Sequence, residues 1–256
     1  RSLWPLLHYR LDVAEFDRQS DRIYRSVNQR FAAPLAPMLE EDIALTNVAL
    51  DLIGQARALY AYAGEAEGEG RDEDQFAYLR DAEGFRNVLL VEQPNGDFAA
   101  TIMRQFLYSA FMLPYWRKLM GSADETLAAI AAKAEKEVAY HVRHSAEWVI
   151  RLGDGTDESH EKIADALEDL WMYTGEMFEV DDADRALIER GIAVDPAALR
   201  AEWETAIDAV FAEAGLTRPS GGWMQTGGRG GRHSEHLGLI LADLQFLQRA
   251  YPGATW

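Results

Sequence analysis

The sequence predicts an all-α fold, in which a bundle of long helices is surrounded by smaller peripheral helices. Apolar residues recur at helical spacing along most of the 256-residue chain, whereas sustained strand-like alternation is hard to find. The longest predicted helices have about 25 residues and would extend about 38 Å at 1.5 Å per residue. Long helices with short connections bury their apolar stripes against one another, so we expect a single domain over residues 1–256.

Prolines, glycines and capping residues divide the chain into these helices. The expected helices cover residues 5–31, 39–67, 98–120, 125–152, 158–178, 195–214 and 234–251, with one or two short helices inside 72–92. Pro34 and Pro37 separate the first helix from the second. Asp97 and Asp124 are suited to cap the third and fourth helices, and Pro196 opens the sixth.

Two of the long helices carry a clear apolar stripe. In the second helix the stripe positions alternate at intervals of four and three: Leu45, Ala49, Leu52, Ala56, Leu59 and Ala63. In the fourth helix one stripe contains Leu127, Ala131, Ala134, Val138, His141, Ser145, Trp148 and Leu152. Such spacing is typical of helices packed lengthwise on other helices.

The composition excludes several classes of function. The chain has 43 acidic against 25 basic residues, and a surface with a net charge of −18 repels nucleic acid and anionic membranes but favours a basic protein partner. The absence of cysteine excludes disulfides, iron–sulfur clusters and thiol nucleophiles in this chain. No apolar run approaches the roughly 18 residues that span a bilayer, and the first residues lack the apolar stretch of a signal peptide. We therefore expect a cytoplasmic protein.

Long helix bundles often hold two iron ions, and the ligand pattern for such a site is specific. Two helices each supply a Glu, and two others each supply Glu-x-x-His. None of the six histidines in this chain has a Glu three residues before it. His160 alone follows a carboxylate at that distance, Asp157, and this pair lies where a helix begins. We therefore expect no catalytic residue, cofactor or metal ion in the chain.

Three polar residues nevertheless stand on apolar helix faces. Asp51 lies within a run of apolar residues, and His141 interrupts the stripe of the fourth helix with Glu137 one turn before it. A buried carboxylate without a partner costs several kcal/mol, so we expect these side chains to form a closed polar cluster in the bundle centre. The cluster is either a hydrogen-bonded network that fixes the register of the helices or a metal or acid–base site. The chain has too few suitably spaced metal ligands, which favours the hydrogen-bonded network.

The glycine-rich stretch 221–233 is a second candidate site. It lacks the Lys-Ser/Thr of a phosphate-binding loop, and no strand precedes it as in a dinucleotide-binding loop. It places Arg229, Arg232 and His233 in front of a helix N-terminus, which suits an anion such as a CoA phosphate or a carboxylate of a partner. The alternative is a flexible turn that covers the end of the bundle.

Four segments, taken in order, resemble a known family. They are residues 50–57 (LDLIGQAR), 87–98 (NVLLVEQPNGDF), 136–141 (KEVAYH) and 226–238 (TGGRGGRHSEHLG), the last followed by Leu247-Gln248-Arg249 and Pro252-Gly253. Together they resemble the C-type structural subunits of the ring-epoxidising multicomponent oxygenases, the phenylacetyl-CoA epoxidases. The resemblance covers about residues 39–256.

The resemblance implies a ferritin-like fold and a non-catalytic, structural role. Such a protein supports the catalytic, A-type subunit, which holds the di-iron site, and the small, B-type subunit is the bridging component of the assembly. A reductase subunit with flavin and an iron–sulfur cluster joins transiently and delivers electrons from NADPH. The complex is a monooxygenase that epoxidises the ring of phenylacetyl-CoA during aerobic phenylacetate degradation.

The catalytic relatives imply that this chain carries a vestigial di-iron region. Their fourth helix resembles Lys-Glu-Glu-x-Phe-His, with the second Glu and the His as ligands, whereas here Val138 replaces that Glu and only His141 remains. Their Glu-x-x-His on the second helix corresponds to Asp51 and Gly54 here. The resemblance does not identify which residues of the first and third helices correspond to the two single Glu ligands of the catalytic relatives. The alternative hypothesis is a noncanonical metal-dependent oxygenase that uses Asp51, Glu137, His141 and Glu176.

Overall fold

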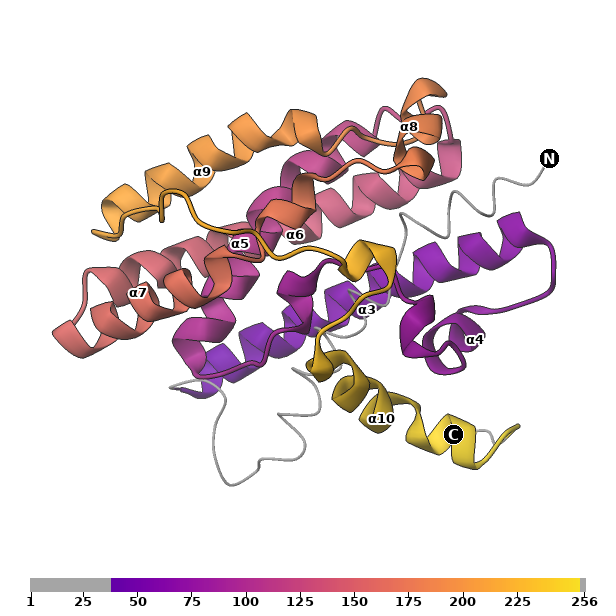
Figure 1. Ribbon diagram of the computed structural model, residues 1–256, viewed down its shortest axis with the longest axis horizontal. Helices are drawn as coiled ribbons and strands as arrows, with labels where there is room; N and C mark the ends of the chain where they lie inside the picture. Colours follow the sequence, from indigo (N-terminus) through magenta and orange to yellow (C-terminus); the bar gives the residue numbers. More distant parts are fainter. Residues whose placement is uncertain (1–37, 254–256) are drawn as a thin grey trace. The chain divides into compact units, whose positions relative to one another are not determined.

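The computed structural model describes residues 38–253, and every regular element within them is helical (Figure 1). The all-α prediction is therefore confirmed for this part of the chain. The helix predicted over residues 5–31 lies outside the described residues. None of the described helices is long and apolar enough to cross a membrane.

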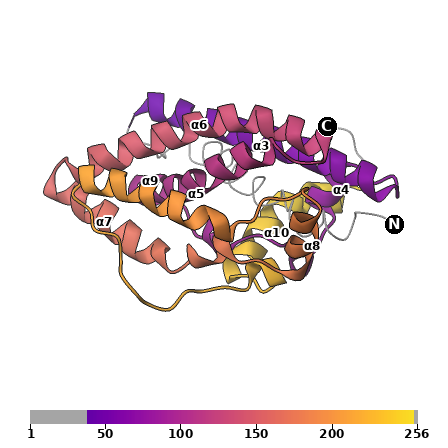
Figure 2. The same ribbon diagram turned by 90° about the horizontal axis from the view of Figure 1, so that it is seen from above.

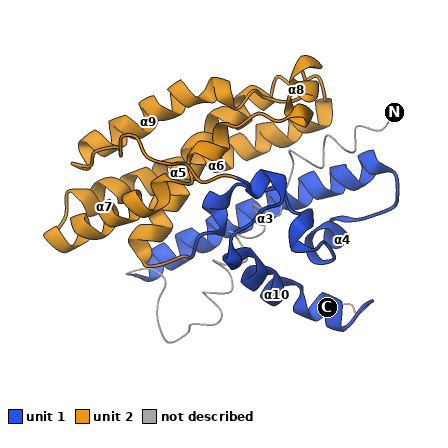
Figure 3. Ribbon diagram, in the orientation of Figure 1, with its two compact units in different colours: residues 1–94, 227–256 blue, residues 95–226 orange. Residues whose placement is uncertain are grey.

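The chain divides into two compact units, which are described one at a time (Figure 3). Unit 1 combines the described residues up to Pro94 with those from Gly227 onward, and unit 2 covers Asn95–Thr226. The expectation of a single domain over residues 1–256 stays a prediction.

Unit 2 is built around α5 (Phe98–Leu119), which packs against α6 (Glu125–Gly153), α7 (Asp157–Trp171) and α9 (Arg200–Glu213) (Figure 2). Almost every side chain of α5 is buried, as expected for a helix that is covered on all sides. Trp203 of α9 is 1% exposed, and its indole N–H donates to the Leu107 carbonyl of α5 at 3.0 Å. This bond fixes the position of α9 along the axis of α5.

The capping residues predicted for α5 and α6 are confirmed. Asp97 accepts from the backbone N–H of Ala100 at 2.9 Å, and Asp124 accepts from those of Thr126 and Leu127, both at 3.0 Å. The apolar stripe of α6 is also confirmed as far as Ser145, and Val149 takes the next buried place. The stripe contacts α5 where the hydroxyls of Ser109 and Ser145 lie 3.5 Å apart.

The helix predicted over residues 158–178 is wrong at its C-terminal end, because α7 stops at Trp171. The hydroxyl of Thr174 donates to the Trp171 carbonyl at 2.8 Å. This carbonyl, in the last turn of α7, therefore has a hydrogen-bond donor although the helix does not continue. The next residue begins the short 3₁₀ helix η3 (Gly175–Phe178), and a Cβ on Gly175 would lie 2.9 Å from Cγ of Met224. A larger residue here would require the Met224 side chain to shift.

The short helix α8 (Asp182–Glu189) is not predicted from the sequence, whereas the 3₁₀ helix η4 (Ala197–Leu199) lies at the start of the predicted sixth helix. A capping box starts α8, since Asp181 and Asp184 each accept from the other's backbone N–H. The predicted start of the sixth helix at Pro196 therefore corresponds to η4, which leads directly into α9.

Unit 1 contains α3 (Leu39–Glu67), α4 (Glu73–Tyr78), α10 (Glu235–Ala250) and the 3₁₀ helices η1 (Ala82–Gly84), η2 (Leu89–Glu92) and η5 (Gly228–Gly230). The predicted seam of α3 is confirmed, because all six of its residues are buried. The short helix α4 packs against both α3 and α10. Unit 1 thus joins two segments that lie far apart in the sequence.

Side chains of α10 hold the C-terminal end of α4. Gln245 donates from Nε2 to the carbonyls of Ala77 and Arg80 at 3.0 and 2.8 Å. Arg249 donates to the carbonyls of Tyr78 and Arg80 at 3.0 and 2.9 Å. Carbonyls at the end of a helix have no partner within it, so these bonds give α10 a defined position on α4.

We expect Gly153→Ala to destabilise the protein by about 1–3 kcal/mol, the usual range for overpacking. A Cβ at this position would lie 2.2 Å from the Ala214 carbonyl oxygen, where α6 meets the end of α9. Gly238→Ala is the matched control, because a Cβ in this turn of α10 meets nothing within 4 Å. The control should stabilise by about 0.5–1 kcal/mol through helix propensity. Urea unfolding of both variants measures the difference, and equal stabilities would contradict the packing described for α6 and α9.

Candidate functional site

The most completely built polar site in unit 1 surrounds the carboxylate of Glu92. This side chain is fully buried, at 0% exposure, at the end of η2. One oxygen accepts from Asn87 Nδ2 at 2.7 Å and from His233 Nδ1 at 2.5 Å. The other accepts from the backbone N–H and the hydroxyl of Ser234, at 2.8 and 2.7 Å. We call these four residues the Glu92 clasp.

His233 uses both ring nitrogens inside the clasp. Nδ1 faces the Glu92 carboxylate, and Nε2 lies 2.9 Å from the carbonyl oxygen of Phe85. Both neighbours are acceptors, so an imidazole with a hydrogen on each nitrogen satisfies both of them.

The Glu92 carboxylate occupies the anion position in front of α10. Ser234 is the N-cap residue of α10, but its hydroxyl donates to Glu92 and does not cap the helix. A carboxylate at a helix N-terminus is favoured by the helix dipole and by the unpaired N–H groups there. The sequence predicts an anion at this place, either a CoA phosphate or a carboxylate of a partner, and the structure fills it with a carboxylate of the same chain.

Two glycines let the C-terminal segment reach the clasp. A Cβ on Gly228 would lie 2.2 Å from the Asn87 carbonyl oxygen, and one on Gly231 would lie 2.4 Å from Nη1 of Arg86. Gly231 also has a φ of +83°, which favours glycine. Of the predicted anion ligands, His233 faces Glu92, Arg229 is half-buried and Arg232 is exposed. The role of Arg229, Arg232 and His233 toward CoA or a partner stays a prediction.

The polar residues of α6 form a second candidate site, in unit 2. His141 is 1% exposed, and Ser145 donates its hydroxyl to the His141 carbonyl at 2.6 Å. Tyr140 stacks on His144 with ring centroids 5.8 Å apart. Glu137 is 18% exposed, and its carboxylate lies 3.6 Å from the ammonium of Lys133. This stretch of α6 therefore combines a buried imidazole with a partly exposed carboxylate one turn before it.

Asp51 of the predicted cluster and Glu176 of the alternative oxygenase hypothesis belong to other elements. Asp51 is half-buried on α3 of unit 1, whereas Glu137 and His141 belong to unit 2, so the proposed cluster of these three residues stays a prediction. Glu176 is fully buried in η3. Within residues 38–253, no group of three or more His, Asp or Glu side chains has the arrangement of a metal site.

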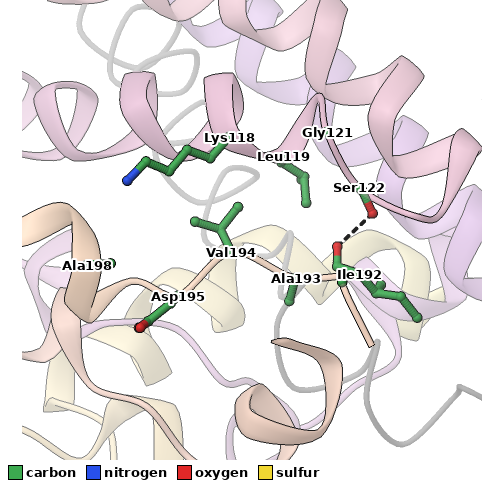
Figure 4. A pocket seen from close by; sticks show the side chains of 10 residues that line it. Lys118, Leu119, Gly121, Ser122, Ile192, Ala193, Val194, Asp195 and Ala198 are labelled. Carbon is green, nitrogen blue, oxygen red and sulfur yellow. Dashed lines mark hydrogen bonds between the residues drawn. The ribbon is translucent and has the colours of Figure 1, made fainter. Parts of the chain in front are cut away.

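A cavity of about 210 Å³ in unit 2 lies where the end of α5 meets residues 191–195 (Figure 4). Ser122 donates to the Ile192 carbonyl at 2.7 Å, and the Lys118 side chain runs away from this bond. Pockets that bury a drug-sized ligand are larger, about 300–1,000 Å³, and combine apolar walls with several converging polar groups. The lining of this cavity is mostly small side chains and backbone that is already bonded, so we assign it no chemistry.

A second cavity, of about 330 Å³, lies between α3 and α4 in unit 1. Its mouth carries the exposed ion pair between Arg57 Nε and Glu73 Oε1, 2.9 Å apart. Partial burial, then the neighbouring carboxylates Asp72 and Glu73, raise the pKa of Asp74 above its usual value. An exposed pair of this kind contributes at most about 1 kcal/mol, so it does not mark a reactive centre.

Sequence reasoning missed Glu92 and Asn87, although both stand in the quoted segment 87–98. The signal was present, because Glu92 ends the apolar run Val88-Leu89-Leu90-Val91 and a carboxylate in such a run needs partners when it is buried. The same argument selected Asp51, which is only half-buried. Two of the three partners of Glu92, His233 and Ser234, lie about 140 residues away in the sequence.

Comparisons with known proteins agree with the resemblance of the four segments. A family model described as "Phenylacetic acid catabolic protein" matches residues 23–256. The C subunit of the 1,2-phenylacetyl-CoA epoxidase of Escherichia coli (strain K12) is 52% identical over 221 residues, which cover 86% of this chain and 89% of that protein. A stretch of 42 residues is 50% identical to trehalose-6-phosphate synthase of Sinorhizobium fredii (strain NBRC 101917 / NGR234) but covers only 9% of that enzyme. A match this short carries no argument about activity.

We expect Glu92→Gln to destabilise the protein by about 2–4 kcal/mol, because an amide replaces one accepting oxygen with a donor that faces other donors. Glu235→Gln makes the same change one residue after the clasp, at an exposed position on α10. That control should alter stability by less than about 0.5 kcal/mol. Chemical denaturation of both variants tests the clasp, and a Glu92→Gln variant as stable as the control would show that the buried carboxylate does not hold the segments together.

Proposed function

The chain belongs to the phenylacetic acid catabolic protein family, and on this basis we propose that it is the non-catalytic, structural subunit of a phenylacetyl-CoA epoxidase. In this role it supports a separate catalytic subunit that epoxidises the ring of phenylacetyl-CoA during aerobic phenylacetate degradation. The observation that carries the proposal is the 52% identity to the C subunit of such an epoxidase across most of both chains.

The register of α6 supports a structural role. Val138 stands where the catalytic relatives have a Glu ligand, and it is 1% exposed on the same buried stripe as His141. A valine there provides apolar contact and cannot ligate a metal. On α3, Gly54 stands in place of a ligand histidine and is half-buried. Two of the four positions compared, Val138 and Gly54, therefore carry residues that cannot ligate a metal, whereas Asp51 and His141 keep polar side chains.

The proposed complex supplies the chemistry that this chain lacks. Its catalytic subunit holds the di-iron site, its small subunit is the bridging component, and its reductase subunit, with flavin and iron–sulfur, joins transiently. The net charge of −18 supports binding to a basic protein surface and disfavours binding to nucleic acid or anionic membranes. We propose that the complex works in the cytoplasm.

We expect the chain, purified alone, to contain no stoichiometric iron and to show no oxygenase activity, because its described helices offer no cluster of metal ligands. Elemental analysis of the protein measures the iron content. The catalytic subunit, purified by the same procedure, is the positive control. Two iron ions per chain would contradict the structural role and would favour the noncanonical oxygenase that uses Asp51, Glu137, His141 and Glu176.

A contribution to substrate binding forms a separate part of the proposal. Arg229 and Arg232 lie in the glycine-rich segment, and Arg232 is exposed. If they contact a CoA phosphate in the complex, replacing both with Ala should raise the Kd for phenylacetyl-CoA about tenfold, which corresponds to about 1.4 kcal/mol. Arg117 and Arg185, exposed in unit 2, provide the control double variant. Titration of the assembled complex makes the comparison, and equal affinity for the two double variants would remove the idea.

A further inference from the structure

The turn before α5 contains the pair Asn95-Gly96, which plays no part in the proposed function. Gly96 is exposed and has a φ of +60°, and a Cβ at this position would lie 2.9 Å from Cβ of Ala100 in the first turn of α5. Both features favour glycine here. Asn95 is therefore followed by the residue that leaves the backbone nitrogen least hindered, because glycine has no Cβ.

The nitrogen atoms of this pair are not engaged by other groups. Asn95 and Gly96 lie outside the helices, and within the described residues neither the Gly96 N–H nor Nδ2 of Asn95 makes a hydrogen bond. A backbone nitrogen that follows an asparagine can attack the side-chain Cγ, because the product is a five-membered ring. A hydrogen bond to either nitrogen would oppose this attack, since it would first have to break. The nucleophile and the leaving group are thus both available.

The amide oxygen of Asn95 faces a buried positive charge. Oδ1 accepts from Nη2 of Arg104 at 2.6 Å, and Arg104 is 4% exposed. The Asn95 carbonyl oxygen accepts from the Thr101 hydroxyl at 2.9 Å, so the residue is held at the start of α5 by two bonds. Negative charge develops on Oδ1 when a nitrogen adds to Cγ. A guanidinium in this position stabilises that charge, as the donors of an oxyanion hole do.

We propose that Asn95 is a site of spontaneous covalent modification, in which the Gly96 nitrogen displaces the side-chain amide and Arg104 promotes the displacement. A bond forms between the Gly96 nitrogen and Cγ of Asn95, and the proton of this nitrogen passes to water. The bond from Cγ to Nδ2 breaks, and Nδ2 gains a proton and leaves as ammonia. A water molecule then opens the cyclic imide. One water is consumed and one ammonia released, so no oxidant or reductant is needed.

The two ways of opening the ring affect α5 differently. One gives aspartate at position 95, which places a carboxylate against the Arg104 guanidinium and makes the present bond a doubly charged one. The other gives isoaspartate, whose main chain is one methylene longer. The extra methylene shifts Asp97, which caps α5 by accepting from the Ala100 N–H at 2.9 Å. The modification therefore acts on the N-terminus of the central helix of unit 2.

The test follows the full-length chain at neutral pH over several days. Peptide mass spectrometry after digestion at acidic pH measures the modified fraction at Asn95, and the same chain unfolded in urea gives the reference rate. We expect the folded chain to be modified at least as fast as the unfolded one. Asn47, exposed on α3 and followed by Val48, is the internal control and should stay unmodified. If only the unfolded chain loses Asn95, the fold protects this residue and the inference is overturned.

Two variants test the role of Arg104. Arg104→Met removes the donor and should slow the reaction of the folded chain about 10- to 100-fold, toward the lower end for loss of one donor to a developing oxyanion, because the site is partly exposed to water. Arg104→Lys keeps a positive donor and should react close to the rate of the unaltered chain. Thermal unfolding confirms that each variant is folded, and in urea all three chains should react alike. A folded Arg104→Met chain that reacts as fast as the unaltered chain, or faster, would overturn the role of the guanidinium.

Discussion

The buried carboxylate of Glu92 is the constraint on which the C-terminal half of unit 1 depends. Burial of an ionised carboxylate is unfavourable by several kcal/mol unless its oxygens are fully hydrogen-bonded. Its donors come from residues 87 and 233–234, so the two segments are stable only when they lie together. Gly228 and Gly231 follow from this requirement, since larger residues would hold the segments apart. The position of Ser234 then sets where α10 begins, and the bonds of α10 to the α4 end set where α10 lies.

The clasp also explains why two of the four segments that carry the family resemblance occur together. Residues 87–98 supply Asn87 and Glu92, and residues 226–238 supply His233, Ser234 and the glycines. Each segment provides the hydrogen-bond partners that the other needs when it is buried. Their shared role within unit 1 is structural.

Local signals in the sequence were sufficient to predict most helices of the described residues. Asp97 and Asp124 bind the first N–H groups of α5 and α6 where they were expected, and the seam of α3 is buried along its whole length. The end of α7 could not be predicted in the same way. At this end the Met172 carbonyl accepts from the backbone N–H of Gln225 at 2.8 Å, a contact between residues about 50 positions apart. The short helix α8 was missed although a local signal, the capping box of Asp181 and Asp184, starts it.

The candidate site was harder to predict than the fold, because its partners are distant in sequence. A carboxylate does lie in front of α10, and it belongs to Glu92 of the same chain. A double-mutant cycle between Glu92→Gln and His233→Asn, followed by urea unfolding, measures this interaction most directly. The structure predicts a coupling energy of about 1–3 kcal/mol between the two positions. Effects that add to within about 0.5 kcal/mol would show that the two side chains do not act together, and would contradict the structural role of the clasp.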